Sequence, residues 1–164
     1  MNGRGEFGYM TELEDNLFKA RNAVFQLLKV RLRSEKEIIE RLKKKKFEDS
    51  LIEETCKYFR DIELIDDRKF AQEWIHSRLN KPFGLNRIKR ELIDKGIAKD
   101  ILEDELKKVD HKNDGELDII QKLVQKRFQG YGHIDKNKLK QRIFGYLIRR
   151  GFSSENTYKA LKEL

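Results

Sequence analysis

The sequence predicts an all-α protein made of tandem three-helix (helix-turn-helix-like) repeats that form an elongated, curved array. Of the 164 residues, 40% are charged, 38% are hydrophobic and one is proline, a composition typical of helical proteins. Apolar residues recur at helical spacing along most of the chain, and no Asn-Gly or Asp-Gly pair lies between alternating apolar residues as it would in a hairpin. A third observation is a pattern of helix, break and helix that occurs three times.

The N-terminal residues 1–14 are expected to be a flexible tail. They contain three glycines and show no apolar periodicity. Residues 3–7 resemble an expression-vector sequence, which would make Met10 the natural start.

The first repeat is expected at residues 15–64, and its first helix should run from Asp15 to near Arg33. Two pairs of residues, Ser34 with Glu37 and Ser50 with Glu53, have the spacing of a capping box. In a capping box each of the two side chains binds a backbone N–H at the start of a helix. These pairs therefore predict where the second and third helices begin.

The second repeat is expected at residues 65–109 and the third at residues 116–164, with a polar linker at 110–115. Asp66 or Asp67 is the predicted cap of the first helix of the second repeat. Its second helix should end at Gly96, because glycine adopts the left-handed conformation that ends a helix without the steric cost of a β-carbon.

Three stretches share the same apolar positions. In each, two apolar residues four apart are followed by one that re-enters the core, and then by another nine residues later. The positions are Ile38, Leu42, Phe47 and Cys56; Ile88, Leu92, Ile97 and Leu106; and Ile143, Leu147, Phe152 and Leu161. The offsets are 50 and 55 residues, and the difference falls in the loop around residues 129–133. Such short helices need their neighbours for stability, so each repeat should pack three helices on one core.

The net charge of +8 lies at the two ends of the chain. Residues 16–60 and 111–164 each carry a net charge of +6, whereas residues 61–110 carry −1. A basic surface attracts polyanions, so nucleic acid or an acidic protein groove is the expected kind of partner. Basic residues lie mainly on the helix before each break, whereas a DNA-reading helix-turn-helix has its basic helix after the turn. For Lys43 to Lys46, complementing the dipole of their own helix is an equally good explanation.

The sequence predicts no enzyme activity, cofactor or metal site. His76, His111 and His133 are scattered, and neither a Cys-x-x-Cys pair nor a phosphate-binding glycine loop is present. No apolar run is long enough to cross a membrane and no leader is evident, so we expect a cytoplasmic protein without membrane contact. Cys56 and Trp74 have core spacing and are expected to be buried.

Three motifs follow one another in a fixed order along the first two repeats. They are Leu28-x-x-Arg31-x-Arg33-Ser34-x-x-Glu37-Ile38, Asp66-Asp67-x-x-Phe70-Ala71-x-x-Trp74-Ile75-x-x-Arg78 and Gly84-x-x-Arg87-Ile88-x-x-Glu91-Leu92-x-x-Lys95-Gly96-Ile97. In order and spacing they resemble the RecX family, the regulators of the RecA recombinase. With the third repeat, the resemblance covers residues 15–164. The chain departs from the family pattern at Lys46, where the family has glycine, and the third repeat matches only loosely.

The resemblance implies a non-enzymatic modulator, in effect an inhibitor, of RecA in homologous recombination, DNA repair and the SOS response. Such a protein lies in the groove of the RecA–DNA filament and restrains ATP hydrolysis and strand exchange. The expected partners are the RecA filament and, weakly on its own, single- or double-stranded DNA, and the chain is expected to be a monomer. The alternative is a free-standing basic helical DNA-binding protein.

Basic residues are the expected contacts with RecA or DNA, because a guanidinium group binds carboxylate and phosphate alike. The candidates are Arg31, Arg33, Arg78, Arg87, Lys89, Arg90, Lys138, Arg142, Arg149 and Arg150. For Arg31 and Arg33, solvent exposure at a helix end is the alternative interpretation.

Overall fold

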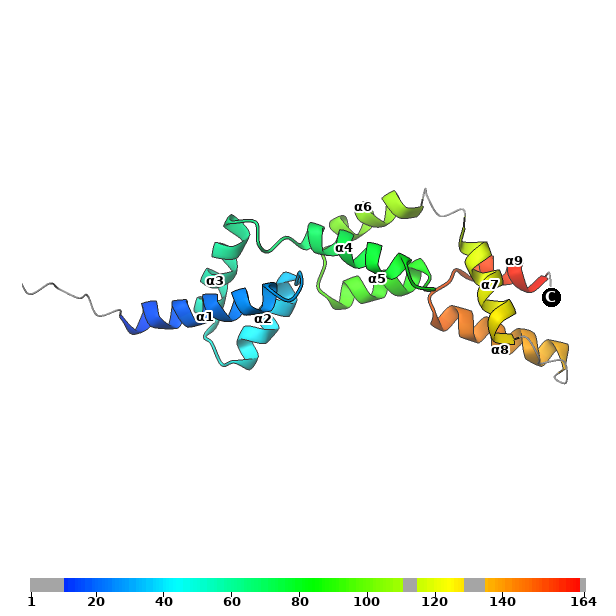
Figure 1. Ribbon diagram of the computed structural model, residues 1–164, viewed down its shortest axis with the longest axis horizontal. Coiled ribbons are helices and arrows are strands. Elements are labelled where there is room, and N and C mark those ends of the chain that lie inside the picture. The colour runs from blue at the N-terminus through cyan, green and yellow to red at the C-terminus, as the bar shows by residue number, and fades with distance from the viewer. Residues whose placement is uncertain (1–10, 111–114, 129–134, 163–164) are drawn as a thin grey trace, which may run out of the picture. The chain divides into compact units, whose positions relative to one another are not determined.

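The computed structural model describes residues 11–110, 115–128 and 135–162, and these ranges contain nine α-helices and no strand. The helices are α1 (Glu12–Leu28), α2 (Glu35–Lys44), α3 (Asp49–Asp61), α4 (Asp67–Leu79), α5 (Leu85–Asp94), α6 (Lys99–Asp110), α7 (Glu116–Phe128), α8 (Lys136–Arg149) and α9 (Ser154–Lys162) (Figure 1). The predicted all-α class is therefore confirmed. The predicted loop at residues 129–133 lies outside the described residues, as do residues 111–114 of the predicted linker and residues 1–10 of the predicted tail.

The chain divides into two units, Met1–Asp67 and Arg68–Leu164. In the first unit, α3 packs against both α1 and α2. Their buried side chains form one core, to which each helix contributes: Ala20, Val24, Ile38, Leu42, Leu51, Ile52, Cys56, Phe59 and Ile65. The second unit contains two such cores, one made by α4 to α6 and one by α7 to α9. The expectation of three helices on one core in each repeat is confirmed.

Helix α1 begins and ends earlier than the apolar pattern predicts. Thr11 and Glu14 form a capping box, so the helix starts at Glu12, within the stretch predicted to be a tail. At the other end, the Val30 N–H bonds to Leu27 O (3.3 Å), which closes a tighter turn. The Val30 side chain is 77% exposed. Val30 therefore makes no core contact that would favour continuing the helix to Arg33.

The capping box predicted at Ser34 and Glu37 is confirmed by hydrogen bonds from Glu37 N to Ser34 Oγ (3.3 Å) and from Ser34 N to Glu37 Oε2 (3.4 Å). The one predicted at Ser50 and Glu53 is wrong. Helix α3 begins at Asp49 after Glu48, which makes no side-chain cap bond, and Glu53 pairs instead with Arg60 (2.8 Å). The register differs because Ile52 N already bonds to Glu48 O (3.0 Å), so Ser50 lies inside the helix.

Asp67 caps a helix other than its own. Its Oδ1 accepts a hydrogen bond from the backbone N–H of Glu35 (2.8 Å), in the first turn of α2. An N–H in the first helical turn has no partner within its helix, so a carboxylate from elsewhere in the fold can satisfy it. Asp67, one of the two residues predicted to cap α4, thus ties the end of the first repeat back to α2.

Each repeat reverses direction at one residue in the left-handed region: Lys46 (φ 64°), Gly96 (φ 81°) or Gly151 (φ 86°). The next residue re-enters the core and its N–H bonds five residues back, from Phe47 to Leu42, Ile97 to Leu92 and Phe152 to Leu147, over 3.1–3.3 Å. This bond and the one before it satisfy carbonyl groups at the helix end. The break predicted in all three repeats is confirmed, including in the first, where the residue is a lysine.

Repeats two and three meet through their backbones. Gly84 N donates to Arg150 O (3.0 Å) and Asn86 N donates to Gly151 O (3.1 Å). A Cβ on Gly84 would lie 2.1 Å from Gly151 O, so only glycine fits there. The carboxyl end of α8 thereby faces the amino end of α5, an arrangement that the two helix dipoles favour.

Cys56 is a buried thiol, as predicted. Burial, reinforced by the nearby Glu35 carboxylate, raises its pKa to about 11. Among the described residues, none of the helices combines the length and the apolar composition that a membrane-spanning segment needs.

Replacing Lys46 with glycine should stabilise the protein, because a residue with a β-carbon is strained at φ 64°. We expect the free energy of unfolding to rise by about 0.5–1 kcal/mol in urea denaturation. Lys45→Gly is the matched control, since it removes the same charge one residue earlier, where φ is −84°. That variant should be destabilised by about 0.5–1 kcal/mol. Equal effects at both positions would contradict this account.

Replacing Gly84 with alanine should destabilise the second unit, because the added methyl group collides with the backbone at Gly151. Overpacking of this kind costs about 1–3 kcal/mol, which thermal or urea unfolding can measure. At Gly115, apart from the glycine and its two chain neighbours, no atom of the described residues lies within 4 Å of the place that a Cβ would occupy. Gly115→Ala should therefore stay within about 0.5 kcal/mol of the parent protein.

Candidate functional site

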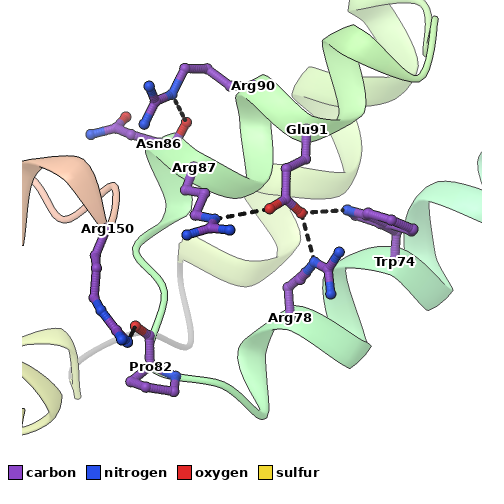
Figure 2. Close-up of polar contacts among 8 residues, drawn as sticks. All are labelled: Trp74, Arg78, Pro82, Asn86, Arg87, Arg90, Glu91 and Arg150. Atoms are coloured by element: carbon purple, nitrogen blue, oxygen red, sulfur yellow. Dashed lines mark hydrogen bonds and ion pairs between the residues drawn. The ribbon is translucent and has the colours of Figure 1, made fainter.

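The predicted contact residues are divided between the two units. Arg31 and Arg33 lie between α1 and α2 in the first unit, and the other eight lie on α4, α5 and α8 or directly after α8 in the second. Three of these eight, Arg78, Arg87 and Arg150, come together around the loop between α4 and α5 (Figure 2). This loop and the side chains around it form the candidate site.

Glu91 on α5 holds two of these arginines. Its carboxylate accepts hydrogen bonds from Arg78 Nε (2.6 Å), Arg87 Nε (2.9 Å) and Trp74 Nε1 (3.0 Å), as Figure 2 shows. Arg87 and Glu91 are four residues apart on α5, and Trp74 and Arg78 are four apart on α4, so each pair shares a helix face. The carboxylate therefore joins the facing sides of two helices.

Burial opposes ionisation of Glu91, but the hydrogen bonds from Arg87, Arg78 and Trp74 outweigh it and hold its pKa below the usual range. The carboxylate is therefore charged at neutral pH and neutralises one of the two guanidinium groups that it binds. Both arginines use Nε for this bond. Their terminal amino groups form the fork that binds a carboxylate or a phosphate in a bidentate manner.

Aromatic rings lie against the arginines of the site. The Cζ of Arg78 lies 4.2 Å from the centre of the Trp74 ring. On the other side of the site, cations and rings alternate in a row that we call the stacked row: Arg87, Phe83, Arg150, Tyr146 and Arg127. The distances from Cζ to ring centre along it are 3.9, 5.6, 5.0 and 4.7 Å. Stacking of this kind leaves the edge of a guanidinium group available to a partner.

Arg150 also connects the third repeat to the second. Its Nη1 donates to Pro82 O (3.0 Å), beside the backbone contact of Gly84 with Gly151. Arg90 points away from Glu91 in Figure 2, and its Nε donates to Asn86 O (3.3 Å) on its own helix. Lys89 is exposed on α5. The structure therefore places Arg90 and Lys89 outside the Glu91 cluster.

The remaining candidates lie elsewhere. Arg31 donates to both carboxylate oxygens of Glu37 (3.0 and 2.8 Å) and supports the capping box of α2. Arg33 Nε is buried and has no hydrogen-bond partner among the described residues. Lys138 and Arg142 are exposed along α8, and Arg149 lies across Gly145 of the same helix.

The residues predicted as contacts do not include Glu91, Phe83, Tyr146 or Arg127. The spacing of four residues between Arg87 and Glu91 is a signal that could have predicted Glu91 as part of the site. No such signal joins Phe83 to Arg150, because they are far apart in the sequence. Trp74 was expected in the core. It packs against the core of the second repeat but is half-buried, and its indole N–H donates a hydrogen bond to Glu91. Within the described ranges, no group of three His, Cys, Asp or Glu side chains could hold a metal ion.

Replacing Glu91 with glutamine should destabilise the second unit by about 1–3 kcal/mol at pH 7, because two guanidinium groups lose their carboxylate. The pKa of Glu91 is lower in the folded protein than its usual value of 4.5. The ionised carboxylate therefore stabilises the fold fully above pH 4.5, and this stabilisation disappears as the pH falls through the lower folded pKa. The difference from the parent protein should therefore shrink below about pH 4.5. Glu103→Gln, at an exposed pair with Lys99 (3.7 Å), is the control and should cost less than about 0.5 kcal/mol.

The chain matches three family models along its length. The first three-helix domain of RecX matches residues 20–59, the second matches residues 66–106 and the third matches residues 114–161. These matches confirm three tandem three-helix domains and the resemblance drawn from the motifs.

Individual relatives and structures agree. The regulatory protein RecX of Clostridium acetobutylicum is 31% identical over 153 residues, covering 92% of this chain and 71% of that protein. The RecX of Clostridium perfringens strain 13 is 33% identical over 141 residues, covering 85% of this chain and 65% of that protein. The crystal structure of RecX from Lactobacillus salivarius superposes with a TM-score of 0.78 at 26% identity and covers 92% of this chain and 97% of its own. The chain therefore belongs to the RecX family.

Proposed function

We propose that the chain is a non-enzymatic modulator, in effect an inhibitor, of the RecA recombinase. In this proposal it binds as a monomer in the groove of the RecA–DNA filament, in the cytoplasm, and restrains ATP hydrolysis and strand exchange. Family membership supports a regulatory role. The observation that carries the proposed binding is that Arg78 and Arg87 share the Glu91 carboxylate, while Arg87 and Arg150 lie against Phe83 in the loop between α4 and α5.

The arrangement of these arginines suits a partner with fixed anionic groups. Each guanidinium group is held by a carboxylate, a carbonyl oxygen or an aromatic ring, so little side-chain freedom remains to be lost on binding. Because Arg150 belongs to the third repeat and Arg87 to the second, one partner surface would contact both repeats at once. Arginine in this setting can bind a protein carboxylate or a DNA phosphate.

The surface next to α5 carries charges of both signs, which favours a protein partner over bare DNA. A hollow of about 430 Å³ is lined by Lys89 and Lys107 and also by Glu103. Carboxylates repel phosphate but pair with the basic side chains of a protein. We therefore assign DNA a secondary role, with weak binding in the absence of RecA.

Replacing Arg87 and Arg90 together with alanine should weaken binding to a nucleotide-stabilised RecA filament by at least roughly tenfold, because two cationic contacts are lost. Helical content should be unchanged in circular dichroism. The matched control is Lys122→Ala with Lys126→Ala, which removes the same charge from exposed positions of α7 in the same unit and should change binding less than about threefold. Unchanged filament binding by the arginine variant would contradict the assignment.

The alternative function is that of a free-standing DNA-binding protein. A DNA titration with and without RecA distinguishes it from the filament proposal. Labelled duplex and single-stranded DNA would be titrated with the chain, with and without RecA, at several salt concentrations. Tight binding to bare DNA that falls steeply with salt would favour the alternative. Binding that depends on RecA would support the filament proposal.

A further inference from the structure

A shallow apolar groove of about 550 Å³ lies between α8 and α9, within the third repeat. Its floor is formed by Phe144, Gly145 and Leu161, and Tyr158 borders it with a side chain that is 59% exposed. The rings of Phe144 and Tyr158 contact each other, with centres 4.9 Å apart. Exposed apolar surface that is lined in this way and bordered by polar groups commonly marks a binding site.

At positions that line the groove, the first two repeats differ from the third. At the offsets that relate the repeats, Gly145 corresponds to Glu40 and Arg90, and Tyr158 corresponds to Glu53 and Glu103. All four of these charged residues are exposed. The first two repeats thus present charged side chains to solvent at positions where the third presents a glycine and an aromatic ring.

Gly145 keeps the floor of the groove open. It lies in the middle of α8 and is not in the left-handed region, so its backbone conformation does not require glycine. Glycine is among the weakest helix formers, and a larger side chain at this position, proline excepted, would favour the helix. A side chain at position 145 would instead enter the space above the helix. That space is bordered by the Arg149 guanidinium, whose Nη1 lies 3.2 Å from the position of a Cβ.

The charged side chains that line the groove, among the described residues, are basic. Lys140 and Lys162 line it, and Arg149 lies across Gly145. None of these three has a carboxylate partner among the described residues, whereas Lys159 of α9 is paired with Glu155 (2.6 Å). An apolar floor with an unpaired cationic border is complementary to a peptide that combines apolar and acidic side chains.

We propose that this groove binds an acidic peptide segment of a partner protein, which places a bulky apolar side chain over Gly145 while its carboxylates pair with Lys140 and Lys162. The site is separate from the stacked row. At 100° per residue, Tyr146 lies on a different face of α8 from Gln141 and Gly145, and Arg150, the residue that caps α8, continues on the side of Tyr146. The proposal therefore does not depend on the filament contacts described above.

The test uses the full chain, labelled with ¹⁵N, and a short synthetic peptide with a central phenylalanine and leucine flanked by glutamates. Amide chemical shifts should change around Gly145, Tyr158 and Leu161, with a dissociation constant of about 0.1–1 mM. A peptide with serine in place of phenylalanine and leucine, and one with lysine in place of the glutamates, should each lose these changes.

Gly145→Leu fills the groove and should weaken peptide binding at least about tenfold, while the melting temperature rises by about 2–4 °C through better helix propensity. Few variants would remove binding and raise stability together, so a loss of fold cannot explain this result. Lys140→Glu with Lys162→Glu should weaken binding at least about fivefold. Its matched control is Lys122→Glu with Lys126→Glu, an equal charge change on α7, which should have less than about a twofold effect.

Three outcomes would overturn the proposal. Peptide-induced shifts could map to Arg87 and Arg150 in place of the groove, or they could persist in Gly145→Leu. Sedimentation could also show a dimer of the chain that Gly145→Leu abolishes, in which case the occupant is a second copy.

Discussion

Each three-helix repeat depends on one backbone reversal, at Lys46, Gly96 or Gly151. The left-handed residue ends the second helix and returns the chain so that the next residue enters the core with its N–H bonded five residues back. Because isolated helices of this length are unstable in water, the third helix must pack on the first two for any of them to persist. The reversal is what makes that packing geometrically possible, and the three cores follow from it.

The last of these reversals has a second effect, because Gly151 also contacts Gly84. The carbonyl groups that end α8 accept hydrogen bonds from the backbone that begins α5, and the absence of a β-carbon on either residue permits this approach. Arg150 comes directly before the glycine, so the contact that joins the two repeats also brings its guanidinium group beside Phe83 and the Pro82 carbonyl. The candidate site is therefore a consequence of how the repeats join.

A few side chains hold the charged groups of this site in place. Glu91 binds Arg78 and Arg87, and the aromatic rings of Trp74 and Phe83 lie against the same two guanidinium groups. The groove of the third repeat differs in kind: its cations surround an apolar floor and have no described carboxylate to bind. One surface suits fixed anionic groups and the other suits an acidic segment with an apolar anchor, so the two would engage different parts of a partner, or different partners.

The helical class, the threefold repeat and the three breaks followed from the sequence, because apolar spacing and helix-ending residues are local signals. The Ser34 capping box also followed from local spacing, whereas the one predicted at Ser50 is wrong because α3 begins directly after Glu48. Local signals also placed Arg78, Arg87 and Arg150 among ten candidates without separating them from the rest. Only the tertiary structure joined them, because Glu91 links Arg78 to Arg87 across two helices and the contact between Gly84 and Gly151 brings Arg150 beside Phe83. Local spacing in the sequence specifies a repeat, whereas the geometry of a site shared by two repeats depends on the contact between their backbones.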